Sequence, residues 1–407
     1  MAGEVTLTCQ VGRERMSTTG SSQLAYVLVE AHPSATSAQV RMPLNFALVL
    51  DHSGSMKGPK LRAVKEAVKL LVNHLDPSDY VSVVIFDDNV RVVVPAQQAA
   101  DKSGINTLVD GIKDAGGTAM SLGMSVGLTE LRKHASPGMV NRMILLTDGV
   151  TYGDADRCRR IADDAGASGI GIYPLGIGAD WDEDLLDNIG HRSGGMPAEF
   201  IRQPEDALGI FERQLRSAAS VSVRAAQLTV RLPAGVTPKR AIKVLPLISE
   251  QKQDALSDHE VVVSLGDIER DAPQATLLEL MIEPKPAGTF RIAQAELSYD
   301  VPSEGQTRIR ADAVVTFTTE KVPPEEANPV VMNYAEKVNA HRLVTRVLDE
   351  YKKTGKITTR IHPNVTRILD PETQRLLQQA SGGGTLSSED VKSIGNKTRK
   401  LTQRFDE

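Results

Sequence analysis

The sequence predicts an α/β protein in which a doubly wound, mostly parallel, Rossmann-like sheet is inserted in an antiparallel β-sandwich and followed by a C-terminal helical region. Three observations predict this architecture. Strand and helix patterns alternate from residue 44 to about 218, period-two strands follow from 222 to 319, and two further strands precede the alternating region. At 407 residues the chain is long enough for two or three domains. We expect these boundaries: 1–41 for the N-terminal sandwich strands, 42–218 for the α/β domain, 219–322 for the rest of the sandwich, and 323–407 for the helices.

The alternating region implies a mostly parallel sheet that is covered by helices on both faces. Its apolar run Leu44–Leu50 is typical of a strand buried on both sides. The expected strands are 44–50, 81–86, 90–94, 142–147, 170–176 and a short one at 200–201. The expected helices are 60–75, 103–113, 119–134, 154–168, 182–190 and 204–218.

The flanking strands alternate apolar and polar residues and are separated by Gly and Pro turn signals. The strands expected after the α/β region are 222–232, 240–247, 259–268, 275–284, 289–300 and 307–319. Two N-terminal strands, within 4–11 and 24–30, are separated by a polar loop at 17–22. Because a lone hairpin is marginally stable in water, we expect these two strands to complete the later sandwich.

The C-terminal region has helical spacing of its apolar residues from 328 to 354. A second helix is expected from Pro371 to Ala380, since proline favours the first helical turn. A last helix starts near Ser387, where acidic residues follow a capping side chain.

Oxygen-bearing side chains follow two of the buried strands. Asp51 ends the first apolar run and is followed by Ser53 and Ser55, while Asp148 follows the run 143–146. Ligands bind at the carboxyl ends of the strands of an open parallel sheet, so both carboxylates are expected at the same edge. Thr118 lies on a glycine-rich loop between them in sequence. Carboxylate and hydroxyl oxygens suit Mg²⁺ or Mn²⁺ and not Zn²⁺, although an aspartate that caps a helix beside turn-forming serines is the alternative interpretation.

Asp-x-Ser-x-Ser, a threonine and a second aspartate, in this order, resemble the metal-ion-dependent adhesion site of von Willebrand factor A (VWA) domains. The resemblance covers all five positions: Asp51, Ser53, Ser55, Thr118 and Asp148. It implies metal-dependent binding of a partner's Asp or Glu, with no catalytic residue and no enzymatic activity. It also implies that Thr118 changes between direct and water-mediated contact, and that the last helix of the domain shifts when the ligand binds. Insertion of such a domain between sandwich strands is similar to integrin-type and coat-protein relatives.

Composition narrows the class of partner. The formal net charge of −5 provides no basic field for nucleic acid, and no apolar run approaches the length of a membrane span. Residues 1–6 show no signal-peptide pattern, and Cys9 and Cys158 form no disulfide framework. We therefore expect a cytoplasmic scaffold or regulator of an intracellular complex. The layout resembles intracellular bacterial VWA proteins, which implies an AAA+ ATPase, a kinase or a phosphatase as the partner.

Two other functions stay open at this point. One is a scaffold whose metal site is filled by the chain itself, with Glu325, Glu326, Asp406 or Glu407 as the source of the carboxylate. The other, less favoured, is a metal-dependent hydrolase. The position two residues after Asp51 is a serine and not the second acid that Asp-initiated phosphatases need, which disfavours phosphoryl transfer through Asp51.

Three further segments have ordinary interpretations. We expect Asp87–Asn89 to form a turn stabilised by its own side chains, and Asp180–Asp184 to begin a helix. The basic residues of 392–404 are expected on a solvated helix face, and His52 is expected to point from its loop to solvent.

Overall fold

The computed structural model describes residues 4–34, 41–136, 138–151, 153–251, 256–301 and 305–403. The chain divides into two compact units. One consists of Ala38–Ala225 with Asp300–Gly305, and the other of Met1–Ser37, Ala226–Tyr299 and Gln306–Glu407. The basic residue Arg404 and the acidic residues Asp406 and Glu407 lie outside the described residues.

The first unit contains a six-stranded sheet in the order β6-β5-β4-β7-β8-β9. All neighbouring strands are parallel except β6, which runs antiparallel to β5 at the sheet edge. The strands are β4 (Leu44–Asp51), β5 (Tyr80–Phe86), β6 (Val90–Gln98), β7 (Val140–Thr147), β8 (Gly171–Ile177) and β9 (Glu199–Ile201). The helices are η1 (Gly54–Met56), α1 (Pro59–His74), α2 (Lys102–Asp110), α3 (Met120–Arg132), α4 (Ala155–Ala167), α5 (Glu183–Arg192), η2 (Pro204–Asp206) and α6 (Ala207–Ala219).

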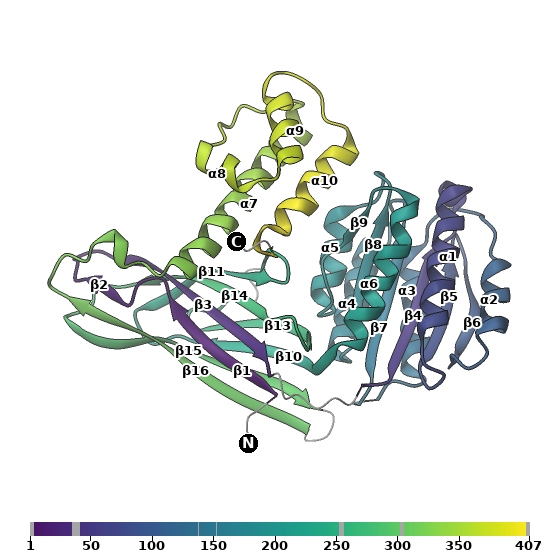
Figure 1. Ribbon diagram of the computed structural model, residues 1–407, viewed down its shortest axis with the longest axis horizontal. Helices are drawn as coiled ribbons and strands as arrows, with labels where there is room; N and C mark the ends of the chain where they lie inside the picture. The colour runs from purple at the N-terminus through teal and green to yellow at the C-terminus, as the bar shows by residue number, and fades with distance from the viewer. Residues whose placement is uncertain are drawn as a thin grey trace. The chain divides into compact units, whose positions relative to one another are not determined.

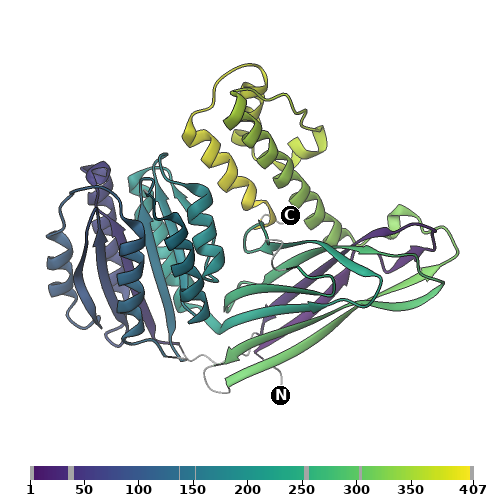
Figure 2. The ribbon, with the colours of Figure 1, turned by 180° about the vertical axis from the view of Figure 1, so that it is seen from behind.

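Helices cover both faces of this sheet (Figures 1 and 2). Phe46, Leu48 and Leu50 of β4 pack with α1, α2 and α6, whereas Ala47 and Val49 pack with α3, α4 and α5. Successive strand residues point to opposite faces, so β4 must be apolar throughout to contact both layers. The predicted doubly wound sheet is therefore confirmed.

The second unit contains two five-stranded sheets that lie face to face (Figures 1 and 2). One has the order β1-β3-β14-β11-β12, with β1 (Val5–Val11), β3 (Gln23–Pro33), β14 (Gln274–Ile282), β11 (Val236–Leu245) and β12 (Ser249–Glu250). The other has the order β13-β10-β15-β16-β2, with β13 (Glu260–Glu269), β10 (Val221–Arg231), β15 (Gly288–Val301), β16 (Gly305–Thr318) and β2 (Arg15–Ser17).

The N-terminal strands complete this sandwich, as the sequence predicted. β3, which precedes the α/β region in the chain, pairs antiparallel with β14, which follows it, from Gln23↔Ile282 to Ala31↔Gln274. The α/β region is therefore an insertion between strands of one sandwich. The short strand β2 was not predicted, and it pairs parallel with β16.

The C-terminal helices pack on the outer face of the β3-β14-β11 part of the sandwich. They are η4 (Pro324–Glu326), α7 (Pro329–Thr354), α8 (Pro363–Ile368), α9 (Pro371–Ser381), α10 (Ser388–Arg399) and η5 (Leu401–Gln403). Val338 and Val344 of α7 share one hydrophobic core with Leu28 of β3 and Leu277 of β14. Helix α10 begins with the predicted cap, a reciprocal pair of Ser387 and Asp390, whereas α8 was not predicted.

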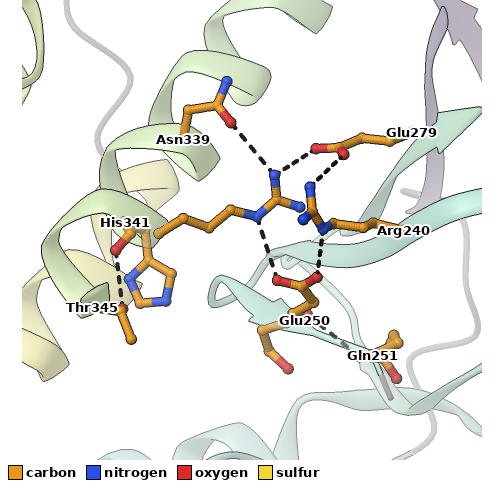
Figure 3. Close-up of polar contacts among 9 residues, drawn as sticks. Arg240, Glu250, Gln251, Glu279, Asn339, His341 and Thr345 are labelled. Atoms are coloured by element: carbon orange, nitrogen blue, oxygen red, sulfur yellow. Dashed lines mark hydrogen bonds and ion pairs between the residues drawn. The ribbon is translucent and has the colours of Figure 1, made fainter. Parts of the chain in front are cut away.

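A set of charged side chains joins α7 to the same sheet (Figure 3). Arg342 of α7 donates to Glu279 of β14 over 2.7 Å and contacts Glu250 of β12 at 3.4 Å. Arg240 of β11 contacts the same two carboxylates at 3.2 and 3.1 Å. The helices are thus attached to the sandwich by ion pairs as well as by apolar contacts.

No helix among the described residues combines the length and the apolar character required to cross a membrane.

Candidate metal centre

The candidate site lies where the strand order of the α/β sheet changes direction. From β4 the chain adds β5 and β6 on one side, and then crosses to β7 and β8 on the other. Asp51 is the last residue of β4, and Asp148 follows the last residue of the neighbouring parallel strand β7. Such a switch point leaves a crevice at the carboxyl ends of the strands, where ligands bind in open α/β sheets.

Asp51 is fully buried, and both of its carboxylate oxygens accept hydrogen bonds. The backbone N–H of Ser53 donates to Oδ1 over 2.8 Å, and Thr147 Oγ1 donates to Oδ2 over 2.6 Å. Burial raises the pKa of Asp51 above its usual range, while these hydrogen bonds act in the opposite direction and the charge of Asp148 adds to the increase. A nearby cation would favour the ionised form of this buried carboxyl group.

A chain of oxygen atoms leads from Ser53 to Asp148. Ser55 Oγ donates to Asp148 Oδ1 over 2.7 Å, and Ser53 Oγ lies 3.1 Å from Ser55 Oγ. Because the single proton of Ser55 goes to the aspartate, Ser53 is the donor to Ser55. Asp148 is 1% exposed, whereas Gly54 and Ser55 are exposed. The site is therefore anchored in the interior and open to solvent at Ser55.

The second carboxylate oxygen of Asp148 faces a lysine. Lys60 Nζ donates to Asp148 Oδ2 over 2.5 Å, and its side chain is 28% exposed. Neither Lys60 nor the hydroxyl of Thr147 was predicted as part of the site. The position of Lys60 in the first turn of α1, where the helix dipole disfavours a cation, is the sequence signal that could have revealed it.

The loop that carries Thr118 is hydrogen-bonded to the segment that contains Ser53 and Ser55. Gly54 N donates to Gly116 O over 3.2 Å, which joins this loop to the Asp-x-Ser-x-Ser segment. A Cβ atom on Gly149 would lie 3.8 Å from Thr118 Oγ1, so the hydroxyl lies next to the residue that follows Asp148. Gly116 has φ +61°, and a Cβ there would lie 2.8 Å from the carboxylate of Asp87, so glycine is required at this position.

The set of donors at this edge consists of oxygen atoms. Among the described residues, no three His, Cys, Asp or Glu side chains gather as a metal cluster, so a metal here would depend on hydroxyl oxygens in addition to Asp51 and Asp148. Hard oxygen donors fit Mg²⁺ and Mn²⁺, and the serine and threonine hydroxyls are neutral ligands that leave the charge of a dication partly uncompensated.

His52 does not point to solvent, and this prediction was wrong. Its side chain is 10% exposed, with Nδ1 2.9 Å from Lys113 O and Nε2 3.8 Å from Asp87 Oδ2. The contacts come from the loops that follow α2 and β5, which no local sequence pattern could place beside His52.

The two acidic segments have the ordinary roles that were predicted. Asp87 Oδ1 accepts from Asn89 N over 2.6 Å within a turn. Asp182 caps α5 by accepting from Leu185 N over 3.0 Å, with Glu183 and Asp184 in the first helical turn.

Comparison with known proteins agrees with this fold. The family model described as von Willebrand factor type A domain matches residues 45–211. The chain contains a VWA domain. Domains of this type are generally interaction modules without enzymatic activity, known for binding protein partners and metal.

Relatives extend the similarity beyond the VWA domain. The uncharacterized protein sll0103 of Synechocystis is 32% identical over 276 residues, which are 67% of this chain and 65% of the relative. The uncharacterized protein YfbK of Escherichia coli is 25% identical over 205 residues, 49% of this chain and 35% of YfbK. The matched regions thus span less than two thirds of either relative.

A solved structure shares the fold of nearly the whole chain. The von Willebrand factor type A protein from Catenulispora acidiphila superposes with a TM-score of 0.77 at 17% identity, covering 97% of this chain and 96% of that one. The VWA domain with its flanking sheets and C-terminal helices is therefore an arrangement that other proteins share.

Proposed function

We propose that this protein is a metal-dependent protein–protein interaction module that binds an acidic side chain of a partner through Mg²⁺ or Mn²⁺. Asp51, Ser53, Ser55, Thr118 and Asp148 hold the cation. The observation that carries the proposal is the chain of oxygen atoms from Ser53 through the exposed Ser55 to Asp148, next to the buried Asp51, whose carboxylate accepts from the backbone N–H of Ser53. When bound there, the cation supplies a positive position that attracts a carboxylate oxygen.

The surface beside the site supports a protein partner. A hollow of about 540 Å³ adjoins it, lined by His52, Asp87, Asn89, Val90, Arg91, Gly111, Lys113, Asp114 and Ala115. Both signs of charge occur in this lining. A partner that offers an Asp or Glu to the metal would place its neighbouring polar residues over such a surface, where paired charges contribute to specificity.

The partner, in this proposal, belongs to an intracellular complex built around an AAA+ ATPase, a kinase or a phosphatase. Cys9 and Cys158 are free, and burial raises the pKa of each thiol to about 12, so both are poorly reactive and compatible with a reducing compartment. The protein acts as a scaffold or regulator in the cytoplasm, without catalysis of its own.

Partner binding can reach the rest of the chain through α6. Arg142 of β7, the strand that leads to Asp148, donates from Nη1 to Gln214 O and Ser217 Oγ of α6, each over 3.0 Å. Its guanidinium also lies 3.9 Å from the centre of the Tyr173 ring. Only Ser220 separates α6 from β10, so a shift of α6 would act directly on that strand.

The second candidate function is a scaffold whose metal site is filled by a carboxylate of the chain itself. Of the acids first considered, Glu326 lies 3.4 Å from Arg15 in an exposed ion pair, and Glu325 lies beside it in η4. A chain truncated after about residue 322 that gained partner binding would favour this second function.

The experiment that tests the proposal is a pull-down from native lysate with the full chain in Mg²⁺ and in EDTA. Wild type and the control Asp156→Ala, which removes an exposed acid of α4, should retain the same partner in Mg²⁺ only. Asp51→Ala, checked for folding by circular dichroism, should retain none. Retention by Asp51→Ala that is equal to wild type would overturn the proposal. Turnover of an ester or phosphoester that disappears in Asp51→Ala would instead indicate the hydrolase.

A further inference from the structure

Lys60 occupies a position that its own helix disfavours. It is the second residue of α1, and no acidic residue lies in the first turn of that helix. The N-terminus of a helix carries a partial positive charge, so a cation there is destabilising. Local helix chemistry therefore does not explain a lysine at this position, and a compensating interaction is required.

The compensating interaction is with a residue of the metal site. Lys60 Nζ donates to Asp148 Oδ2 over 2.5 Å, while Ser55 donates to Asp148 Oδ1 over 2.7 Å. Asp148 is 1% exposed, and an unpaired charge of that burial would be costly. The lysine thus satisfies the one oxygen of Asp148 that Ser55 does not.

The loop after β8 bounds the ammonium group on another side. Gly178 has φ +75°, and a Cβ atom on it would lie 3.5 Å from Lys60 Nζ and 3.6 Å from Lys60 Cε. The lysine therefore lies in a defined place between Asp148 and this loop, in contrast to Lys57, an exposed lysine only three residues earlier.

We propose that Lys60 is a built-in competitor of the divalent cation for Asp148, and that it sets the charge that the loaded site presents to its partner. This inference rests on the function proposed above. A dication held by Asp51 and Asp148 would share the carboxylate of Asp148 with the ammonium group of Lys60, and the two cations repel each other. Two carboxylates and one ammonium carry a formal charge of −1, and a dication brings it to +1. Lys60 therefore weakens metal binding and leaves the loaded site net positive toward a carboxylate.

The test measures binding of Mn²⁺ alone to the full chain, from the electron paramagnetic resonance signal of the free ion. Lys60→Met removes the charge and keeps an unbranched side chain, and Lys57→Met, three residues earlier and before α1 begins, is the matched control. Lys60→Met should bind Mn²⁺ about tenfold more tightly than wild type, because the competing charge near the cation is lost from a partly solvated position. Lys57→Met should stay within about twofold of wild type, since Lys57 is exposed and its charge is screened by solvent and salt.

The outcomes separate this inference from the proposed function. If Lys60→Met binds Mn²⁺ more tightly than wild type and Lys57→Met does not, both the role of Lys60 and the metal site are supported. This holds also if wild type binds Mn²⁺ too weakly to measure. Equal binding by wild type and Lys60→Met overturns the competition and leaves the metal site intact. Weaker binding by Lys60→Met overturns it as well and makes Lys60 a positioning residue that supports Asp148. No binding by any of the three chains overturns the metal site itself.

Discussion

Glu279 is the more buried of the two carboxylates that pair with Arg342 of α7, and we predict that Glu279→Ala destabilises the attachment of α7 to the sandwich by about 2 kcal/mol. Glu279 lies on β14 with its side chain 7% exposed, and its carboxylate forms ion pairs with both Arg342 and Arg240 (Figure 3). Its neighbour Glu250 contacts the same two arginines but is 47% exposed. The pair of acids therefore provides a matched comparison of a buried and an exposed partner.

The magnitude follows from what the substitution leaves behind. Removal of one partner from a buried ion pair costs roughly 3–5 kcal/mol, because the other charge is left without compensation. Here Arg342 keeps its contact with Glu250 at 3.4 Å, and Arg240 is 50% exposed and can be hydrated. These two facts reduce the expected loss to about 2 kcal/mol. Glu250→Ala removes an exposed partner and should cost less than about 1 kcal/mol.

The assay is urea unfolding of the full chain, followed at once by far-UV circular dichroism and by tryptophan fluorescence. The sequence contains 1 tryptophan, Trp181, which lies in the α/β unit, so fluorescence reports that unit. The loss in Glu279→Ala should be seen by circular dichroism and should leave the fluorescence midpoint in place. A larger loss in Glu250→Ala than in Glu279→Ala, or a shift of the fluorescence midpoint alone, would show that the buried ion pairs of Glu279 do not hold α7 on the sandwich.

Three other predictions concern packing, pH and metal. Gly190→Ala should lower the stability of the α/β unit by about 3 kcal/mol in the same fluorescence-detected unfolding, since its Cβ would lie 1.8 Å from Met196 O. Gly209→Ala in α6, whose Cβ would lie 3.8 Å from Arg213 Nη1, should raise this stability by about 0.5–1 kcal/mol. Burial lowers the pKa of His341 to about 4, so folding resists its protonation: stability should be complete above about pH 6.5 and fall by about 3 kcal/mol as the pH decreases to about 4, and His341→Gln should show a shallower decline by circular dichroism. Mg²⁺ at about 100 times its dissociation constant should stabilise the α/β unit by about 2.7 kcal/mol. Asp51→Ala should abolish this gain, and in EDTA it should change the free energy of unfolding by less than the gain itself.

The sequence was sufficient for the parts of the fold that depend on long, regular patterns. The buried run that forms β4 and the helical stripe of α7 extend over several turns or pleats, so period and length agree with the final structure. Strand β2 and helix α8 have 3 and 6 residues, too few for a period to be read. Their existence depends on contacts with distant segments, such as the pairing of β2 with β16.

The site divides in the same way. Asp51 and Asp148 could be placed together because each ends a buried strand, and the rule for parallel sheets brings those ends to one edge. Lys60 could not be placed, because its contact with Asp148 depends on how α1 lies against β7 and on the loop at Gly178. The prediction for His52 was wrong for a similar reason. The carbonyl oxygen that its Nδ1 contacts belongs to Lys113, 61 residues later in the chain.

The proposed metal site is tested by the amount of Mg²⁺ that the full chain retains at equilibrium dialysis, measured by elemental analysis. We expect one Mg²⁺ per wild-type chain, one for the surface control Asp156→Ala, and none for Asp51→Ala or Asp148→Ala. A wild-type chain without Mg²⁺, or an Asp51→Ala chain that retains as much as wild type, would contradict the metal site on which the proposed function rests.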